Sequence, residues 1–161
     1  MTFKNCLSKS VSAFLLVSSL GFAACAQSTT LLTVTPPTRA NVKRGETVTA
    51  KIGIKVNEGF HVNSNAPLDE YLIPLRLTWQ PAPLELKGVT FPPAKQEKSE
   101  FSPKPIAVFD GAFEITSKFT VPANAPIGAG FITGKLRYQG CNATTCFPPK
   151  TVDVRFSYDL Q

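Results

Sequence analysis

Short runs of alternating hydrophobic and polar residues recur along the chain from Thr29 onward. The clearest run spans Glu46 to Asn57, in which every second residue between Val48 and Val56 is apolar and the residues between them are mostly Thr and Lys. Because successive side chains of a strand point to opposite faces, this period of two predicts a strand with one buried face. No stretch of ten or more residues shows a helical period, and 14 prolines disfavour long helices. The sequence therefore predicts an all-β sandwich.

Proline and glycine clusters separate the remaining predicted strands. These are Leu31–Thr35, Phe60–Asn63, Tyr71–Gln80, Leu84–Val89, Ile106–Asp110, Ala112–Val121, Phe131–Gln139 and Thr151–Leu160. We interpret Arg39–Gly45 as a turn and Ala94–Pro105 as an exposed charged loop containing one aromatic residue, Phe101. Trp79 alternates with polar neighbours, which favours a core position over a ligand-binding one. The last two strands are expected to form a hairpin.

The N-terminus has the pattern of a secretory signal. Lys4 and Lys9 precede an apolar run from Val11 to Ala24, and no acidic residue occurs before Glu46. We therefore expect a signal peptide over residues 1–26 and a single mature domain over residues 27–161. Cleavage before Cys25 with lipidation of that cysteine is the alternative. In either case the predicted location is the periplasm or another extracytoplasmic compartment, where a disulfide can persist.

Charge and composition disfavour several classes of function. The chain carries 17 basic and 11 acidic residues, and without Lys4 and Lys9 the balance is 15 against 11, a net charge of +4. The basic residues are scattered singly, so we expect no nucleic-acid partner. No Ser/His/Asp set, paired carboxylates or glycine-rich phosphate loop is evident, which disfavours hydrolases and transferases. We expect no cofactor.

Cys141 and Cys146 are the only cysteines of the predicted mature domain, and they lie at the tip of the predicted terminal hairpin. A disulfide that closes a loop of about six residues contributes on the order of 2 kcal/mol, against nearly 5 kcal/mol for a loop of about a hundred residues. Because this stabilisation is small, we favour a reactive pair over a purely stabilising disulfide. A reactive pair needs one partly exposed sulfur whose thiolate is stabilised. Arg137 and Lys150 flank the loop.

His61 is the sole histidine, and two interpretations of it remain open. It could handle protons near the cysteines, or it could be a surface residue with satisfied hydrogen bonds, and we favour the second. A metal site made of the two cysteines and His61 would have at most three ligands, and the spacing matches no common zinc site.

The segment Tyr138-Gln-Gly-Cys141-Asn-Ala-Thr-Thr-Cys146-Phe-Pro-Pro149 resembles the cysteine motif of the N-terminal (alpha) domain of the thiol:disulfide interchange protein DsbD family. The resemblance extends to Glu58–Val62, Ile73–Trp79 and Phe91-Pro-Pro. It implies an immunoglobulin-like antiparallel β-sandwich whose cysteines alternate between dithiol and disulfide. It further implies electron transport from a membrane-embedded donor to thioredoxin-like extracytoplasmic partners, including those of cytochrome c maturation.

The resemblance also implies residue roles. Cys146 would attack the partner, Cys141 would resolve the mixed disulfide, and Phe101 would shield the pair from a cap loop. Around them the resemblance suggests a substrate-binding or shielding role for Glu100, His61, Tyr138 and Phe147. The chain differs from the family pattern at Ser99, His61 and Asn63, where acidic or tyrosine side chains are usual.

Two hypotheses follow. The first, which we favour, is an extracytoplasmic electron carrier of the protein-disulfide reductase type. Because the sequence ends at Gln161, we expect its electrons to come from a separate membrane thiol donor, and we expect membrane contact only through a lipid anchor. The second is an immunoglobulin-like binding or structural module with a purely structural hairpin disulfide.

Overall fold

The computed structural model describes residues 31–99 and 102–161. The predicted signal segment, Glu100 and Phe101 lie outside the described residues. In the described part every regular element is a strand, which confirms the all-β prediction. Within the same residues no helix has the length and apolar character needed to cross a membrane.

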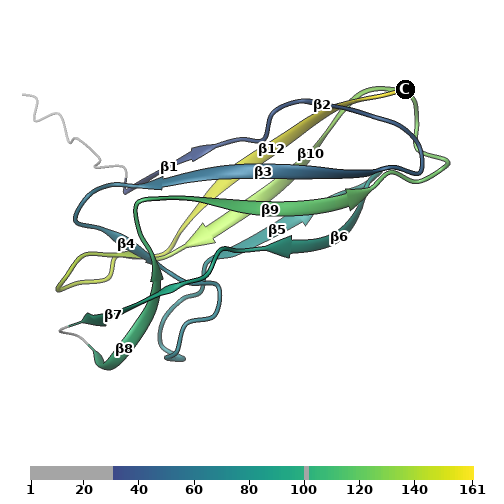
Figure 1. Ribbon diagram of the computed structural model, residues 1–161. Helices are drawn as coiled ribbons and strands as arrows, with labels where there is room; N and C mark the ends of the chain where they lie inside the picture. The colour runs from purple at the N-terminus through teal and green to yellow at the C-terminus, as the bar shows by residue number, and fades with distance from the viewer. Residues whose placement is uncertain (1–30, 100–101) are drawn as a thin grey trace, which may run out of the picture.

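Two four-stranded sheets pack face to face as an immunoglobulin-like sandwich (Figure 1). In spatial order, the first sheet contains β1 (Leu32–Thr35), β3 (Thr47–Val56), β9 (Ala112–Thr120) and β6 (Glu85–Thr90). The second contains β2 (Ala40–Val42), β12 (Lys150–Leu160), β10 (Gly128–Tyr138) and β5 (Arg76–Gln80). The strand pairs are antiparallel except that β2 runs parallel to β12.

A third, smaller sheet lies at one end of the sandwich, and the C-terminus lies at the other end (Figure 1). Its order is β11 (Gly140–Cys141), β4 (His61–Asn63), β8 (Ser102–Phe109) and β7 (Lys95–Ser99). All three pairings in this sheet are antiparallel. The cysteine segment is therefore one edge of a sheet whose other edge is the β7–β8 hairpin.

The core lies between the two large sheets. On β3 the residues Ala50, Ile52, Ile54 and Val56 are buried, as their alternation predicted. Trp79 is also buried, which confirms its predicted core position. Its indole Nε1 donates a hydrogen bond of 2.9 Å to Ser117 Oγ, and its ring meets Phe119 edge to face at 5.3 Å. The sandwich thus provides a rigid base for the third sheet.

Three local predictions were wrong. Residues 39–45 are not only a turn, because Ala40–Val42 pairs with the C-terminal strand β12, which is too distant in sequence to be foreseen from a three-residue segment. Residues 95–99 and 102–105, which were predicted to belong to a loop, form β7 and the start of β8. These strands are largely exposed on both faces, so they lack the alternation that marks a half-buried strand. The strand predicted at Tyr71 begins only at Arg76.

Candidate functional site

Cys141 and Cys146 form a disulfide at the end of the β10–β12 hairpin, as the resemblance implied. The two residues face each other as an antiparallel bridge. Cys141, in β11, is completely buried, whereas Cys146 is half-buried. The two sulfurs therefore differ in environment, and Cys146 is the one that another molecule can reach more easily.

The loop between the cysteines is held by hydrogen bonds from its own backbone. Asn142 Oδ1 accepts from the backbone N–H groups of Thr144 and Thr145 at 3.0 and 2.7 Å. The Asn142 N–H donates to the Thr145 carbonyl at 2.9 Å, and the Phe147 N–H donates to the Gly140 carbonyl at 2.8 Å. An asparagine that bonds its own backbone in this way fixes a tight turn. Hydrogen bonds therefore support the loop geometry in addition to the disulfide.

Gln139 connects the base of this loop to the rest of the third sheet. Its Oε1 accepts from Asn63 Nδ2 at 3.0 Å and from the Ile73 N–H at 3.1 Å. Its Nε2 donates to the Phe147 carbonyl at 3.2 Å. Asn63 is fully buried and also donates to the Ile73 carbonyl at 3.1 Å. The Gln139 side chain thus connects the two ends of the cysteine loop to β4 and to the segment that follows it.

His61 is buried beside the disulfide, so the favoured interpretation of it as a surface residue was wrong. It stands directly opposite Cys141 in the β4–β11 register. The imidazole Nδ1 lies 3.9 Å from Glu97 Oε2 of β7. Burial lowers the pKa of His61, while the negative charges of Glu97 and Asp110 act in the opposite direction. The neutral imidazole is therefore favoured near pH 7.

A pocket of about 430 Å³ separates the cysteine loop from the β7–β8 hairpin. One wall is Ala143 of the cysteine loop, and the opposite wall is Glu97, Lys98 and Ser99 of β7. His61 lines it from β4. Among the described residues, no group of three His, Cys, Asp or Glu side chains is arranged to hold a metal ion.

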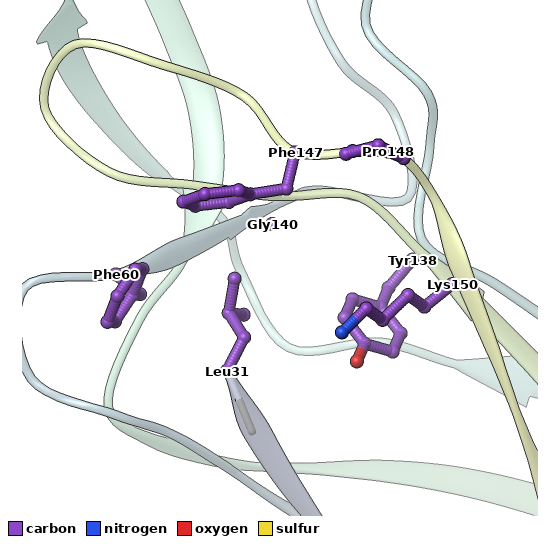
Figure 2. Close-up of a pocket in the computed structure, with 7 residues that line it drawn as sticks. All are labelled: Leu31, Phe60, Tyr138, Gly140, Phe147, Pro148 and Lys150. Atoms are coloured by element: carbon purple, nitrogen blue, oxygen red, sulfur yellow. The ribbon is translucent and has the colours of Figure 1, made fainter. Parts of the chain in front are cut away.

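A second pocket, of about 370 Å³ and largely apolar, lies beside Phe147. Figure 2 shows the Phe147 ring extending over Gly140 toward Phe60, with Leu31 below. The Phe60 and Phe147 rings are 6.0 Å apart. Gly140 permits this arrangement, because a Cβ there would come within 2.1 Å of Leu31 Cδ1. Tyr138 and Lys150 line the other side of the pocket.

A family model described as "Thiol:disulfide interchange protein DsbD, N-terminal" matches residues 28–157. The chain belongs to this family. The thiol:disulfide interchange protein DsbD of Haemophilus ducreyi is 34% identical over 76 residues, which make up 47% of this chain and 12% of that protein. The chain thus spans a minor part of that relative's length. Membership of the DsbD N-terminal family and the Cys141–Cys146 disulfide together fit thiol–disulfide exchange.

A solved structure supports the same fold. The N-terminal periplasmic domain of ScsB from Proteus mirabilis superposes with a TM-score of 0.54 at 9% identity, covering 78% of this chain and 44% of that one. At this identity the likeness shows the fold alone.

The DsbD N-terminal fold brings most of the predicted site residues together. Cys141 and His61 pair across strands, Phe147 follows Cys146 directly, and buried Tyr138 lines the apolar pocket. Burial raises the pKa of Tyr138. The predicted shielding residues Glu100 and Phe101 lie outside the described residues.

Sequence reasoning missed the surroundings of His61. The sequence pattern places Glu97 in an exposed charged loop and Asp110 at the end of a predicted strand. Both approach the ring because β4 pairs with β8, and β8 with β7. Only the charge of Glu97 within a polar segment could have drawn attention to it, since pairing between distant strands leaves no local pattern.

Proposed function

We propose that this domain is an extracytoplasmic electron carrier that reduces thioredoxin-like proteins through its Cys141/Cys146 pair. The observation that carries the proposal is the disulfide between a fully buried and a half-buried sulfur in a DsbD N-terminal fold. A pair with unequal access suits an exchange in which one sulfur meets the partner and the other completes the reaction.

In the proposed cycle, the Cys146 thiolate attacks the disulfide of the partner. A mixed disulfide forms, and the partner's second sulfur leaves as a thiolate. The Cys141 thiol then loses its proton and attacks Cys146 Sγ, which releases the partner's first sulfur. The domain ends as the disulfide and the partner as the dithiol, so two electrons pass to the partner. A membrane thiol donor would restore the dithiol by the reverse exchange.

The apolar pocket beside Phe147 is the proposed docking surface for the partner. Phe60 and Phe147, the residue after Cys146, contribute aromatic side chains to this pocket, and buried Tyr138 also lines it. Aromatic side chains are enriched among residues that dominate binding energy at protein interfaces. On the family resemblance alone, we also propose that Phe101 and Glu100 shield the pair between encounters.

The proposed location is the periplasm. A signal peptide over residues 1–26 would export a mature domain of residues 27–161, with lipidation at Cys25 as the alternative. The Proteus mirabilis structure of similar fold is itself described as a periplasmic domain. N-terminal sequencing and mass measurement of the exported protein distinguish the two cleavage sites, because a lipidated chain begins at Cys25 and is heavier by its acyl groups.

Partner trapping tests the proposal. With Cys141→Ser, the exchange should stop after the first attack and accumulate a mixed disulfide with a thioredoxin-like protein. Cys146→Ser should capture far less, because the remaining sulfur is buried. Non-reducing electrophoresis of periplasmic extracts, with and without dithiothreitol, followed by mass spectrometry, identifies the captured partner.

Two measurements together would identify a purely structural disulfide. If neither variant captures a protein, and the reduction potential of the pair lies below about −300 mV, the bond is a structural clip on an immunoglobulin-like module. Potentials closer to those of cellular dithiol carriers, together with capture by Cys141→Ser, support the carrier.

A further inference from the structure

His61 and Cys141 occupy directly opposed positions in the antiparallel pair of β4 and β11. Opposed residues of such a pair project to the same face of the sheet, with their Cβ atoms close together. Cys141 has no exposed surface, and only 8% of His61 is exposed. The only imidazole of the chain therefore lies beside the buried sulfur, on the same side of the third sheet.

The two ring nitrogens of His61 have different surroundings. Nδ1 faces the Glu97 carboxylate at 3.9 Å, whereas Nε2 is buried and has no hydrogen-bond partner within residues 31–99 and 102–161. A carboxylate near Nδ1 favours a proton on that nitrogen, and the proton-free Nε2 is then an acceptor. A buried acceptor without a partner calls for an explanation in a folded protein.

Charged groups around the ring affect the pKa of His61 in the direction opposite to burial. Glu97 of β7 and Asp110 after β8 provide negative charge that favours protonation of the ring. Asp110 also forms an ion pair with Lys95, and Lys98 lines the same pocket. Burial of the ring acts against these carboxylates and keeps it neutral between reactions. A neutral ring in this setting can accept a proton, and the carboxylates then stabilise the charged form.

We propose that His61 accepts the proton of the Cys141 thiol when Cys141 resolves the mixed disulfide. The inference rests on the proposed carrier function. The thiol proton passes to Nε2, the Cys141 thiolate attacks Cys146 Sγ, and the partner sulfur departs as a thiolate that takes up a proton from the ring or from water. Glu97 stabilises the imidazolium formed in between. Cys141 has no solvent-exposed surface, so an internal acceptor removes the need for bulk solvent at this step.

The test uses the reduced protein and one equivalent of 5,5′-dithiobis(2-nitrobenzoate), a small aromatic disulfide. Attack by Cys146 releases the first nitrothiobenzoate, and resolution by Cys141 releases the second, so absorbance reports the two steps separately. With His61→Gln, we expect the first phase to be unchanged and the second to slow by at least about tenfold at pH 7. Its rate should then rise about tenfold per pH unit, because only the spontaneously ionised thiol reacts.

The wild-type second phase should instead level off above the pKa of His61. Glu97→Gln is the second variant, chosen because Glu97 is partly exposed and glutamine has nearly the same shape without the charge. Loss of its negative charge should move that plateau to lower pH. A second phase with the wild-type rate and pH profile in both variants would overturn the role of His61. If the wild type itself shows no second phase, the carrier function is contradicted instead.

Discussion

Replacing Gln139 by alanine should loosen the base of the cysteine loop. The side chain makes three hydrogen bonds, to Asn63, to the backbone N–H of Ile73 and to the carbonyl of Phe147. Alanine leaves the backbone between β10 and β11 unchanged but can make none of these side-chain bonds. Asn63 retains its bond to the Ile73 carbonyl, whereas the Ile73 N–H and the Phe147 carbonyl lose a partner that the partly buried site does not easily replace with water.

The size of the effect follows from these bonds. A typical intramolecular hydrogen bond contributes about 0.5–1.5 kcal/mol, and a buried group left without a partner costs about 1–3 kcal/mol. Three bonds at a partly buried site therefore predict a loss of about 2–4 kcal/mol in the free energy of unfolding, near the upper end for a single substitution.

Urea unfolding of the oxidised protein, followed by circular dichroism, measures this loss. Gln80→Ala is the matched control, since Gln80 is an exposed glutamine on β5 that accepts a hydrogen bond from Thr133 at an exposed site. The control should change the free energy of unfolding by less than about 0.5 kcal/mol. If Gln139→Ala and Gln80→Ala have the same stability, the network does not hold the loop.

Three further results are expected. The double variant Cys141→Ser/Cys146→Ser should remain folded and lose only about 2 kcal/mol in urea unfolding, because the closed loop is short; failure to fold would identify the bond as a necessary clip. Phe147→Ala should slow reduction of a thioredoxin-like partner by about tenfold while leaving the reaction with a small aromatic disulfide unchanged. Phe131→Ala, at an exposed phenylalanine of β10, is the control. If Phe147→Ala slowed the reactions with both substrates equally, a docking role would be contradicted. Asp159 accepts hydrogen bonds from Arg39 that lower its pKa from 3.8, so its stabilising effect is complete above pH 3.8 and is lost as the pH falls through the folded-state pKa. Asp159→Asn should therefore be less sensitive to acid than wild type in urea midpoints measured from pH 5 downward, and parallel curves would contradict this.

Local patterns made much of the fold predictable. The alternation of Val48 to Val56 gave β3, and the two C-terminal runs gave the hairpin that ends at the cysteines. These signals exist because one face of each strand is buried. β7 and the first part of β8 have no such signal, since their described residues up to Pro105 are mostly exposed. The parallel pairing of β2 with β12 joins two segments that are far apart in the sequence, so no local pattern indicates it. Periodicity reports burial, so it cannot identify strands held mainly by backbone pairing.

The same limit applies to the site. The cysteine motif is contiguous, so the sequence could identify both sulfurs and their neighbours Tyr138 and Phe147. The setting of His61 depends instead on two strand pairings that bring β4 between β11 and β8. Those pairings bury the ring, place it opposite Cys141 and set Glu97 against it. A short disulfide loop adds little stability to a sandwich with an extensive core, and a clip requires no imidazole opposite its buried sulfur. The joint presence of an accessible sulfur, a buried one and a facing imidazole is therefore better explained by exchange chemistry than by stabilisation.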